Sequence, residues 1–256
     1  MPKDEPMAAN PPFGAVIDYV IGTAPSLAAI TLEILDANDN LVRRYSSADK
    51  APAPDPAKLT TAPEWFNVPS TLSTAPGMHR FVWPLRYVAP SAFARGRGIY
   101  ADGIWAPPGN YRVVLTVNGQ RLTQPLIVAP DPRIHLPATA YAEEFAFAKQ
   151  IESARVAVAA AREEAGTAMK KLTDETQKSR LNDIADIVPE EQWWLAPHST
   201  TSLRFLDNAL QKLETAVDGA DAAPTADARA SWAQLKPAVD AALRAWSEFK
   251  GTISGR

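Results

Sequence analysis

The sequence predicts an α+β protein of two domains, an antiparallel β-sandwich followed by an antiparallel three- or four-helix bundle. Two observations support this prediction. Hydrophobic residues first recur at every second position, as in strands, and later at every third or fourth position, as in helices. Proline also crowds the part of the chain before Pro137 and becomes sparse after it. We therefore expect an N-terminal tail over residues 1–12, a β domain over 13–130 and a helical domain over 131–256.

Short apolar runs predict the strands of the first domain. The expected strands cover residues 15–21, 30–34, 41–45 and 78–85. Alternation within the second run is clear, because Ile30, Leu32 and Ile34 are separated by polar residues. In the fourth run His79, Phe81 and Trp83 share one face, which predicts a large apolar surface on that strand.

The strongest local signal is a hairpin. Alternating residues from Tyr111 to Val117 are followed by Asn118-Gly119 and a second run over 120–128, and Asn-Gly favours a type I′ turn. Five to seven strands without a helical period between them are typical of an immunoglobulin-like sandwich. The proline-rich stretches 51–76 and 90–108 are longer than ordinary hairpin loops, so we expect them to wrap the sandwich or to contact something else.

Helical periodicity begins after Asp131-Pro132. A first helix should start near Thr139, and Gly166 is a place where it could be interrupted before a second helix or a kinked continuation over 172–188. A third helix is expected over 199–217, with leucines spaced three and four apart. Thr225 is a natural N-cap for a fourth helix, which Pro237 should kink or divide.

Composition excludes several classes of protein. A net charge of -3 argues against nucleic-acid binding, and the basic pairs Arg43-Arg44 and Lys170-Lys171 are interpreted as solvated surface. No apolar run is long enough to cross a bilayer, so we expect no membrane insertion. Residues 1–10 lack the apolar core of a secretion signal. The absence of cysteine is compatible with the cytosol and with bacterial export.

The sequence predicts no catalytic, cofactor-binding or metal-binding residue. Asp36 to Asn40 begins like a calcium loop but lacks its later glycine and glutamate, which favours a polar turn. His79, His135 and His198 lie too far apart for a recognisable metal motif, and His79 is expected in a core or an interface. The pairs Glu143-Glu144 and Glu163-Glu164 are interpreted as solvated helix faces, and Glu190-Glu191 is a third pair.

Aromatic residues on the long connections are the candidate ligand or interface residues. Rings of this kind can stack on sugars or cover an interface between domains. Trp193-Trp194 lies between two prolines and is expected to close one end of the bundle or to sit at the joint between domains. The candidates are Trp65, Phe66, Tyr100, Trp105, Trp193 and Trp194, with Phe93 beside them on the second connection.

Six segments resemble the C-terminal region of bacterial sortilin-type and Asp-box β-propeller proteins, which are usually labelled glycosyl hydrolases. The resemblance covers nearly the whole chain and is carried, in order, by Asn10–Tyr19, Thr31–Asp36, Val42–Ser47, Gly77–Trp83, Leu85–Tyr87 and Pro108–Gly119. In such proteins a propeller precedes an immunoglobulin-like module and a helical tail. The Asp-box pattern Ser-x-Asp-x-Gly-x-Thr-Trp is absent from this sequence, so no role of the propeller is carried over.

The resemblance implies a noncatalytic accessory or interaction module that docks against a β-propeller in a parent or partner chain. It also implies an exported, periplasmic or extracellular protein. One alternative is a carbohydrate-binding module that holds a glycan with the loop aromatics. Another is a glycosidase fragment with residual activity, because two carboxylates beside a sugar bond are sufficient for hydrolysis.

Overall fold

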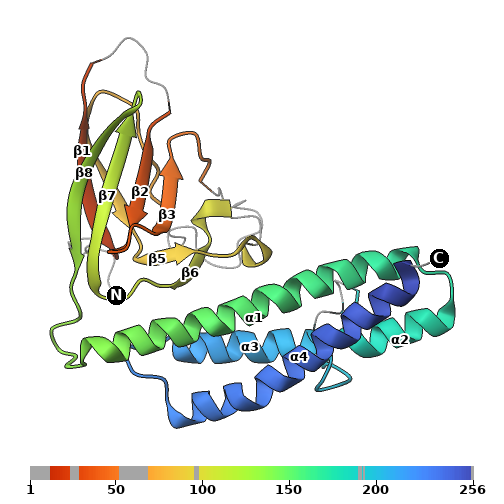
Figure 1. Ribbon diagram of the computed structural model, residues 1–256. Helices are drawn as coiled ribbons and strands as arrows, with labels where there is room; N and C mark the ends of the chain where they lie inside the picture. The colour runs from red at the N-terminus through yellow and green to blue at the C-terminus, as the bar shows by residue number, and fades with distance from the viewer. Residues whose placement is uncertain are drawn as a thin grey trace, which may run out of the picture. The chain divides into compact units, whose positions relative to one another are not determined.

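The computed structural model describes residues 12–23, 29–51, 69–94, 98–189, 192 and 194–254. The chain divides into two compact units, Met1–Pro130 and Asp131–Arg256, which we call the β unit and the helical unit. Figure 1 shows antiparallel strands in the β unit and four α-helices among the described residues of the helical unit. The protein is therefore a mixed α and β structure with antiparallel sheets.

The β unit contains one four-stranded sheet and two pairs of strands. The four-stranded sheet has the order β3-β2-β7-β8, and β1 pairs with β4 and β5 with β6. All of these pairings are antiparallel. The strands are β1 (Ala15–Ile21), β2 (Thr31–Leu35), β3 (Leu41–Ser46), β4 (Gly77–Trp83), β5 (Arg86–Val88), β6 (Asp102–Trp105), β7 (Gly109–Val117) and β8 (Gln120–Val128).

The predicted strands are confirmed, and two short strands, β5 and β6, are added to them. The hairpin of β7 and β8 forms around Asn118 and Gly119, whose φ angles of 50° and 82° are those of the expected I′ turn. The polar turn before β3 also forms, because Asp36 Oδ1 accepts hydrogen bonds from the N–H groups of Asn38 and Asn40. The stretch 90–108 is not a simple excursion: it contains β6, which pairs back to β5.

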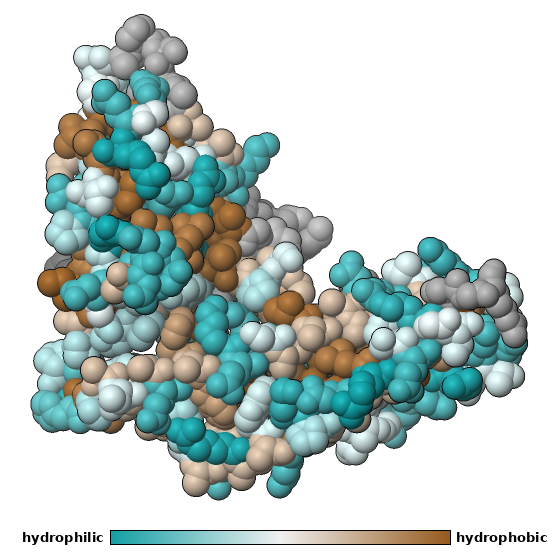
Figure 2. Space-filling model, in the orientation of Figure 1, coloured by the Kyte–Doolittle hydropathy of each residue, from teal (hydrophilic) through white to brown (hydrophobic). Residues whose placement is uncertain are grey.

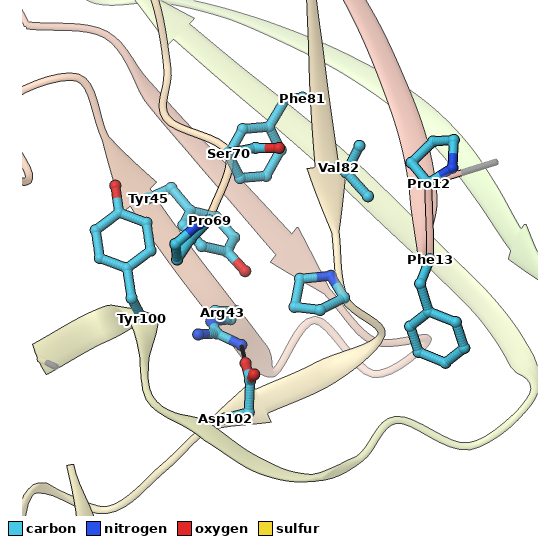
Figure 3. A pocket seen from close by; sticks show the side chains of 11 residues that line it. Pro12, Phe13, Arg43, Tyr45, Pro69, Ser70, Phe81, Val82, Tyr100 and Asp102 are labelled. Atoms are coloured by element: carbon cyan, nitrogen blue, oxygen red, sulfur yellow. Dashed lines mark hydrogen bonds and ion pairs between the residues drawn. The ribbon is translucent and has the colours of Figure 1, made fainter. Parts of the chain in front are cut away.

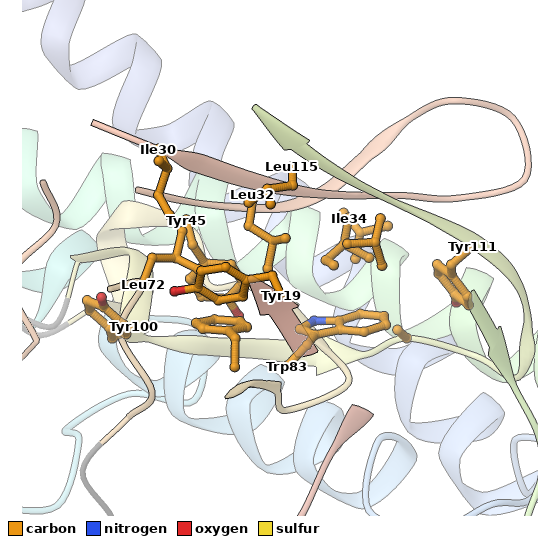
Figure 4. Close-up of a cluster of buried hydrophobic side chains, with 14 of the residues drawn as sticks. Tyr19, Ile30, Leu32, Ile34, Tyr45, Leu72, Trp83, Tyr100, Tyr111 and Leu115 are labelled. Carbon is orange, nitrogen blue, oxygen red and sulfur yellow. The ribbon is translucent and has the colours of Figure 1, made fainter. Parts of the chain in front are cut away.

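The core of the β unit is one cluster of buried side chains, to which both the β1–β4 pair and the four-stranded sheet contribute. Figure 4 shows the buried side chains that both contribute to one cluster. Trp83 of β4 lies edge-on to Tyr111 of β7 at 5.4 Å, and Tyr45 of β3 lies edge-on to Phe81 of β4 at 4.7 Å. Edge-to-face ring pairs of this kind add to the free energy gained by burial. The core is therefore built largely from aromatic rings.

The helical unit contains α1 (Ala138–Lys171), α2 (Glu175–Ala185), α3 (Leu203–Val217) and α4 (Ala226–Ser254). Helix α1 packs against α3 and α4, and α2 packs chiefly against α4. Sequence signals mark the beginnings of three helices: Asp174 and Ser202 accept hydrogen bonds from the first turns of α2 and α3, and Thr225 Oγ1 accepts one from Ala228 N–H.

Two residues that could have divided a helix do not divide it. Gly166 lies inside α1, which continues to Lys171, and Pro237 lies inside the single helix α4. A glycine costs a helix interior only about 1 kcal/mol, which the packing of a long helix offsets. Helix α1 instead ends at Leu172, whose backbone is extended, and α2 starts after its own cap.

Candidate functional site

The candidate site of the β unit begins with an irregularity in β3. Tyr45 pairs with Leu32 and Arg43 pairs with Ile34, so both side chains share the inward face. The register then shifts, and the next pair joins Leu35 to Leu41, which leaves Val42 as an extra residue. This bulge buries Val42 and Arg43 together, whereas Leu41 is exposed. The interpretation of the Arg43-Arg44 pair as solvated surface is therefore wrong for Arg43.

Arg43 holds the segment that precedes β6. Its Nη2 donates to Ile99 O at 2.5 Å and to Ala101 O at 3.2 Å, and its Nε also donates to Ile99 O. Its Nη1 donates to Asp102 Oδ1 at 2.7 Å and makes a long contact to Arg86 O at 3.5 Å. A guanidinium has five N–H donors. These contacts use all five, so Arg43 is a structural anchor whose charge is balanced by Asp102.

A cavity of about 330 Å³ opens beside this anchor. Figure 3 shows its lining, with the Arg43–Asp102 pair at one end and apolar side chains at the other. The volume is at the small end of the range for small-molecule sites, about 300–1,000 Å³. The lining includes Arg43, Tyr45, Ser70, Phe81, Tyr100 and Asp102.

The hydroxyl of Tyr45 is buried near the polar end of this cavity. The side chain is only 2% exposed, and its Oη has no hydrogen-bond partner among the described residues. Figure 3 shows this hydroxyl directed toward Arg43 and Asp102. Burial raises the pKa of Tyr45 well above its usual value, so the hydroxyl keeps its proton and can donate as well as accept. A buried hydroxyl without a partner costs free energy.

The cavity also brings together part of the predicted aromatic set. Tyr100 lines it but is only 3% exposed, so the face of this ring is not an open platform. Trp105 lies next to the lining residue Phe13, with the two rings edge-on at 5.6 Å, and carries the guanidinium of Arg86 3.7 Å from its ring centroid. Phe93, on the same connection, is half-buried.

The other predicted aromatics are not brought to this cavity. Trp194 belongs to the helical unit and is 66% exposed. Trp65, Phe66 and Trp193 lie outside the described residues. The cavity residues that the sequence analysis missed are Arg43, Tyr45, Ser70 and Asp102. The two-residue spacing of Arg43 and Tyr45 could have placed them on one strand face, but the pairing of Arg43 with residue 102 has no sequence signal.

The carboxylate pairs of the helical unit have different surroundings. Glu143 is exposed and pairs with Arg229, and Glu164 accepts bonds from Lys250 and Trp246. Glu144 was expected on a solvated face and is instead 8% exposed. Desolvation, with Asp218 and Asp221 nearby, raises its pKa to about 7. Glu190-Glu191 lies outside the described residues.

The histidines serve separate structural roles. The His79 ring bonds through Nε2 to Ala75 O at 2.7 Å and lies beside Tyr19. The His198 Nδ1 lies 2.7 Å from Asp186 Oδ1, and the same aspartate pairs with Arg204 at the start of α3. Within the described part of the chain, no three His, Asp or Glu side chains form a group suited to a metal ion.

A second feature of the β unit is an apolar outer face on the β1–β4 pair. The register places Val20 opposite Met78 and Asp18 opposite Arg80, with Val16 two residues further along the same face. Val20 and Met78 are 72% and 71% exposed. The charges of Asp18 and Arg80 compensate each other, because Arg80 donates two hydrogen bonds of 2.8 Å to the Asp18 carboxylate. We call Val16, Val20, Met78 and this ion pair the docking face.

The docking face continues into a hollow between β1 and β8, which lie side by side in Figure 1. The hollow measures about 400 Å³ and is lined by Val16, Val20 and Leu122, among others. Leu122 is 62% exposed, although its cross-strand partner Leu115 is buried. Figure 2 shows hydrophobic surface over the strands of the β unit.

None of the helices, over the residues that the structure describes, has the length and apolar composition to cross a membrane. Comparisons with family models, with curated proteins and with solved structures give no significant match to this chain.

Proposed function

We propose that this chain is a noncatalytic accessory module that binds a partner, a β-propeller of the Asp-box type, in the same or another polypeptide. The docking face is the observation that carries the proposal. The propeller is the partner that the sequence resemblance implies. An exported location belongs to the same proposal, because the resemblance is to exported proteins.

The chemistry of the docking face supports a protein partner. Its apolar side chains project from neighbouring strands and surround one neutral ion pair, so that an apolar partner surface would leave no uncompensated charge. Exposed apolar residues that gather in one area mark interaction sites more often than single exposed residues do. The hollow beside Leu122 would give such a partner a place to insert a side chain.

The finer fold is part of the same proposal. We infer an immunoglobulin-like sandwich for the β unit, supported by the ring contacts that join β4 to β3 and β7. For the helical unit we infer an antiparallel four-helix bundle, supported by the packing of α1 against α3 and α4. A sandwich and a bundle can each hold a binding surface in place, as the proposed noncatalytic module needs.

The test is calorimetric binding of this chain to a purified Asp-box β-propeller protein. Val20→Lys and Met78→Lys each place a charge in the docking face and should weaken binding at least tenfold, because a buried lysine would lack a partner. Leu41→Lys is the matched control, since Leu41 is exposed on β3, away from this face. Equal binding by all three variants, or no binding by the wild-type chain, would contradict the proposal.

A further inference from the structure

The hollow between β1 and β8 runs along the edges of both strands. Its lining includes the continuous run Val16–Val20 of β1 and the residues Gln124, Pro125 and Leu126 of β8. Successive side chains of a strand point to opposite faces, so a continuous run of lining residues places the hollow along the edge of the strand. The lining also includes Leu115, which belongs to the core. The hollow therefore leads from the two strand edges to the core of the β unit.

Strand β1 leaves backbone groups unpaired along this edge. In an antiparallel pair, every second residue turns its N–H and C=O groups away from the partner strand. Among the described residues, the backbone of β1 is hydrogen-bonded only to β4. A row of unpaired N–H and C=O groups is a template on which another strand can form. The free edge of β1 offers such a row over its seven residues.

The edges of β1 and β8 differ in their protection. Edge strands commonly carry proline, lysine or a bulge, each of which hinders pairing with another chain. Strand β8 contains Pro125, which has no N–H to donate. Strand β1 contains no proline and no lysine, and it pairs with β4 without a register shift. Its one charged side chain, Asp18, is bound to Arg80. The unprotected edge is therefore that of β1.

Strand β8, across the hollow, carries an apolar side chain that is not covered. Leu122 pairs with Leu115, so the two side chains lie on the same face of their sheet, the face that is turned to the core. Leu115 is only 9% exposed, whereas Leu122 is 62% exposed. The β1–β4 pair thus covers Leu115 but not Leu122. One more strand beside β1 would cover it.

From the free edge and the uncovered leucine we infer that the β unit binds an extended segment of another polypeptide, which pairs with β1 as an added strand and packs a side chain on Leu122. Main-chain hydrogen bonds supply the affinity in this mode of binding, and pockets for alternate side chains supply the selectivity. The segment should carry an apolar residue at every second position and no charge at its centre, because the lining residues Val16, Val20 and Leu122 are apolar.

A second copy of this chain is a poorer occupant of the edge. Its own β1 could form the backbone hydrogen bonds, but Tyr19 and Ile21 on the inward face of that strand are 7% and 5% exposed, because they pack in their own core. These side chains could not also cover Leu122. The inference goes beyond the proposed function, since the donor segment is defined by its alternating pattern and does not have to belong to a propeller.

The experiment is an NMR titration of the full chain, labelled with ¹⁵N, with capped peptides of about eight residues. In these peptides threonine alternates with valine, leucine or phenylalanine between terminal lysines. We expect at least one peptide to bind at millimolar concentration and to slow the hydrogen exchange of every second amide of β1. A peptide with the same side chains and an N-methylated backbone should bind at least tenfold more weakly, because it cannot donate main-chain hydrogen bonds.

Two variants of β8 test the place of binding. Leu122→Lys puts a charge beneath the added strand and should weaken peptide binding at least tenfold, while the exposure of Leu122 lets the variant fold as the wild-type chain does. Ile127→Lys is the matched control, because Ile127 is 73% exposed on the opposite face of the same strand. It should bind the peptide normally.

Met78→Lys separates this inference from the proposed function. Met78 belongs to the docking face but does not line the hollow, so the variant should lose the propeller and keep the peptide. The inference is overturned if no peptide binds, if the N-methylated peptide binds as tightly as its parent, or if Leu122→Lys and Ile127→Lys bind equally. Slow exchange of alternate β1 amides in the free chain would also overturn it, because the edge would then already be covered by this chain or by a second copy.

Discussion

The two units bury polar groups in different ways. In the β unit the buried side chain of Arg43 donates to backbone carbonyls and to one partly exposed aspartate. In the helical unit, charged side chains pair across helices: Arg155 of α1 donates to Glu214 of α3 at 2.8 Å, and Arg162 pairs with Asp207. The connection before β6 exposes carbonyls that an arginine can reach, whereas the carbonyls within a helix are already bonded. Buried charge on the helices therefore pairs with other side chains or with a carbonyl outside the helices, as Arg204 does with Asp186 and Leu195 O.

The apolar cores of the two units also differ, in the kinds of side chain that fill them. The β unit fills its core with rings, including Trp83, Phe81 and Tyr45. The helical unit buries leucines on α3 and alanines on α1, with Trp246 and Phe249 near the end of α4. Large rings leave large voids when they are removed, so the two units should respond differently to substitution. The following predictions test this difference, beginning with the largest effect.

Trp83→Ala should lower the free energy of unfolding of the β unit by about 3 to 5 kcal/mol, because the ring is fully buried against Tyr111. Native-state hydrogen exchange of the β2 and β7 amides measures this loss for the β unit alone. Trp194→Ala, which removes an exposed tryptophan, should change stability by no more than about 0.5 kcal/mol. A loss below about 1 kcal/mol for Trp83→Ala would show that the ring is not in a packed core.

Arg43→Met should cost about 3 kcal/mol or more, since it leaves Ile99 O without the Arg43 donors and Asp102 without its counter-charge. In the helical unit the double variant Arg155→Leu/Glu214→Leu removes both partners of a buried pair. It should be neutral or stabilising by about 1 to 3 kcal/mol, because the desolvation cost disappears with the charges. Urea unfolding measures the free energy of unfolding of both variants. Similar losses of stability in the two would contradict the difference between the units.

Glu144→Gln should stabilise the helical unit at pH 8 by about 1 to 3 kcal/mol. The folded state raises the pKa of Glu144 to about 7 from the usual 4.5, so the folded chain holds the extra proton between these values. The contribution of Glu144 to stability is therefore fully present below about pH 4.5 and is lost as the pH rises from there to about 7, because the folded state then holds a charged carboxylate near Asp218 and Asp221. Thermal unfolding at pH 5 and pH 8 measures the effect. The variant should lose this part of the pH dependence, and Glu143→Gln, which alters an exposed neighbour, should retain it.

Tyr45→Phe should change the stability of the β unit by less than about 1 kcal/mol, and in the stabilising direction, because it removes a buried hydroxyl that lacks a described partner. Tyr111→Phe removes a hydroxyl that donates to Pro107 O, and it should cost about 1 kcal/mol. Urea midpoints of the two variants test the smallest difference predicted here. A larger loss for Tyr45→Phe would mean that its hydroxyl is satisfied in the folded chain.

Local patterns in the sequence predict most of the regular structure. The Asn118-Gly119 turn depends on two adjacent residues, and the alternation around Leu32 follows from one buried face. The strands β5 and β6 were missed because each has only three or four residues, and their pairing joins residues far apart in the sequence. The helices also continue undivided through Gly166 and Pro237, which the local sequence could not decide.

Much less of the candidate site could be predicted. The choice of aromatic residues on the long connections identified Tyr100, which lines the cavity. The polar end of the cavity depends on the bulge at Val42 and on the approach of Asp102 to Arg43. Neither has a local pattern, because a bulge is a property of two paired strands. The burial of Glu144 was missed for a similar reason: two adjacent glutamates on a helix look alike in sequence, and only the packing of α3 distinguishes them.

The anchoring of residues 99–101 by Arg43 has a consequence for variation in this part of the chain. The guanidinium binds main-chain oxygens of Ile99 and Ala101, and every amino acid supplies such an oxygen. The hydrogen bonds that attach this segment to β3 therefore do not depend on which side chains the segment carries. A substitution of Tyr100, which belongs to the core, would thus cost packing without removing the attachment.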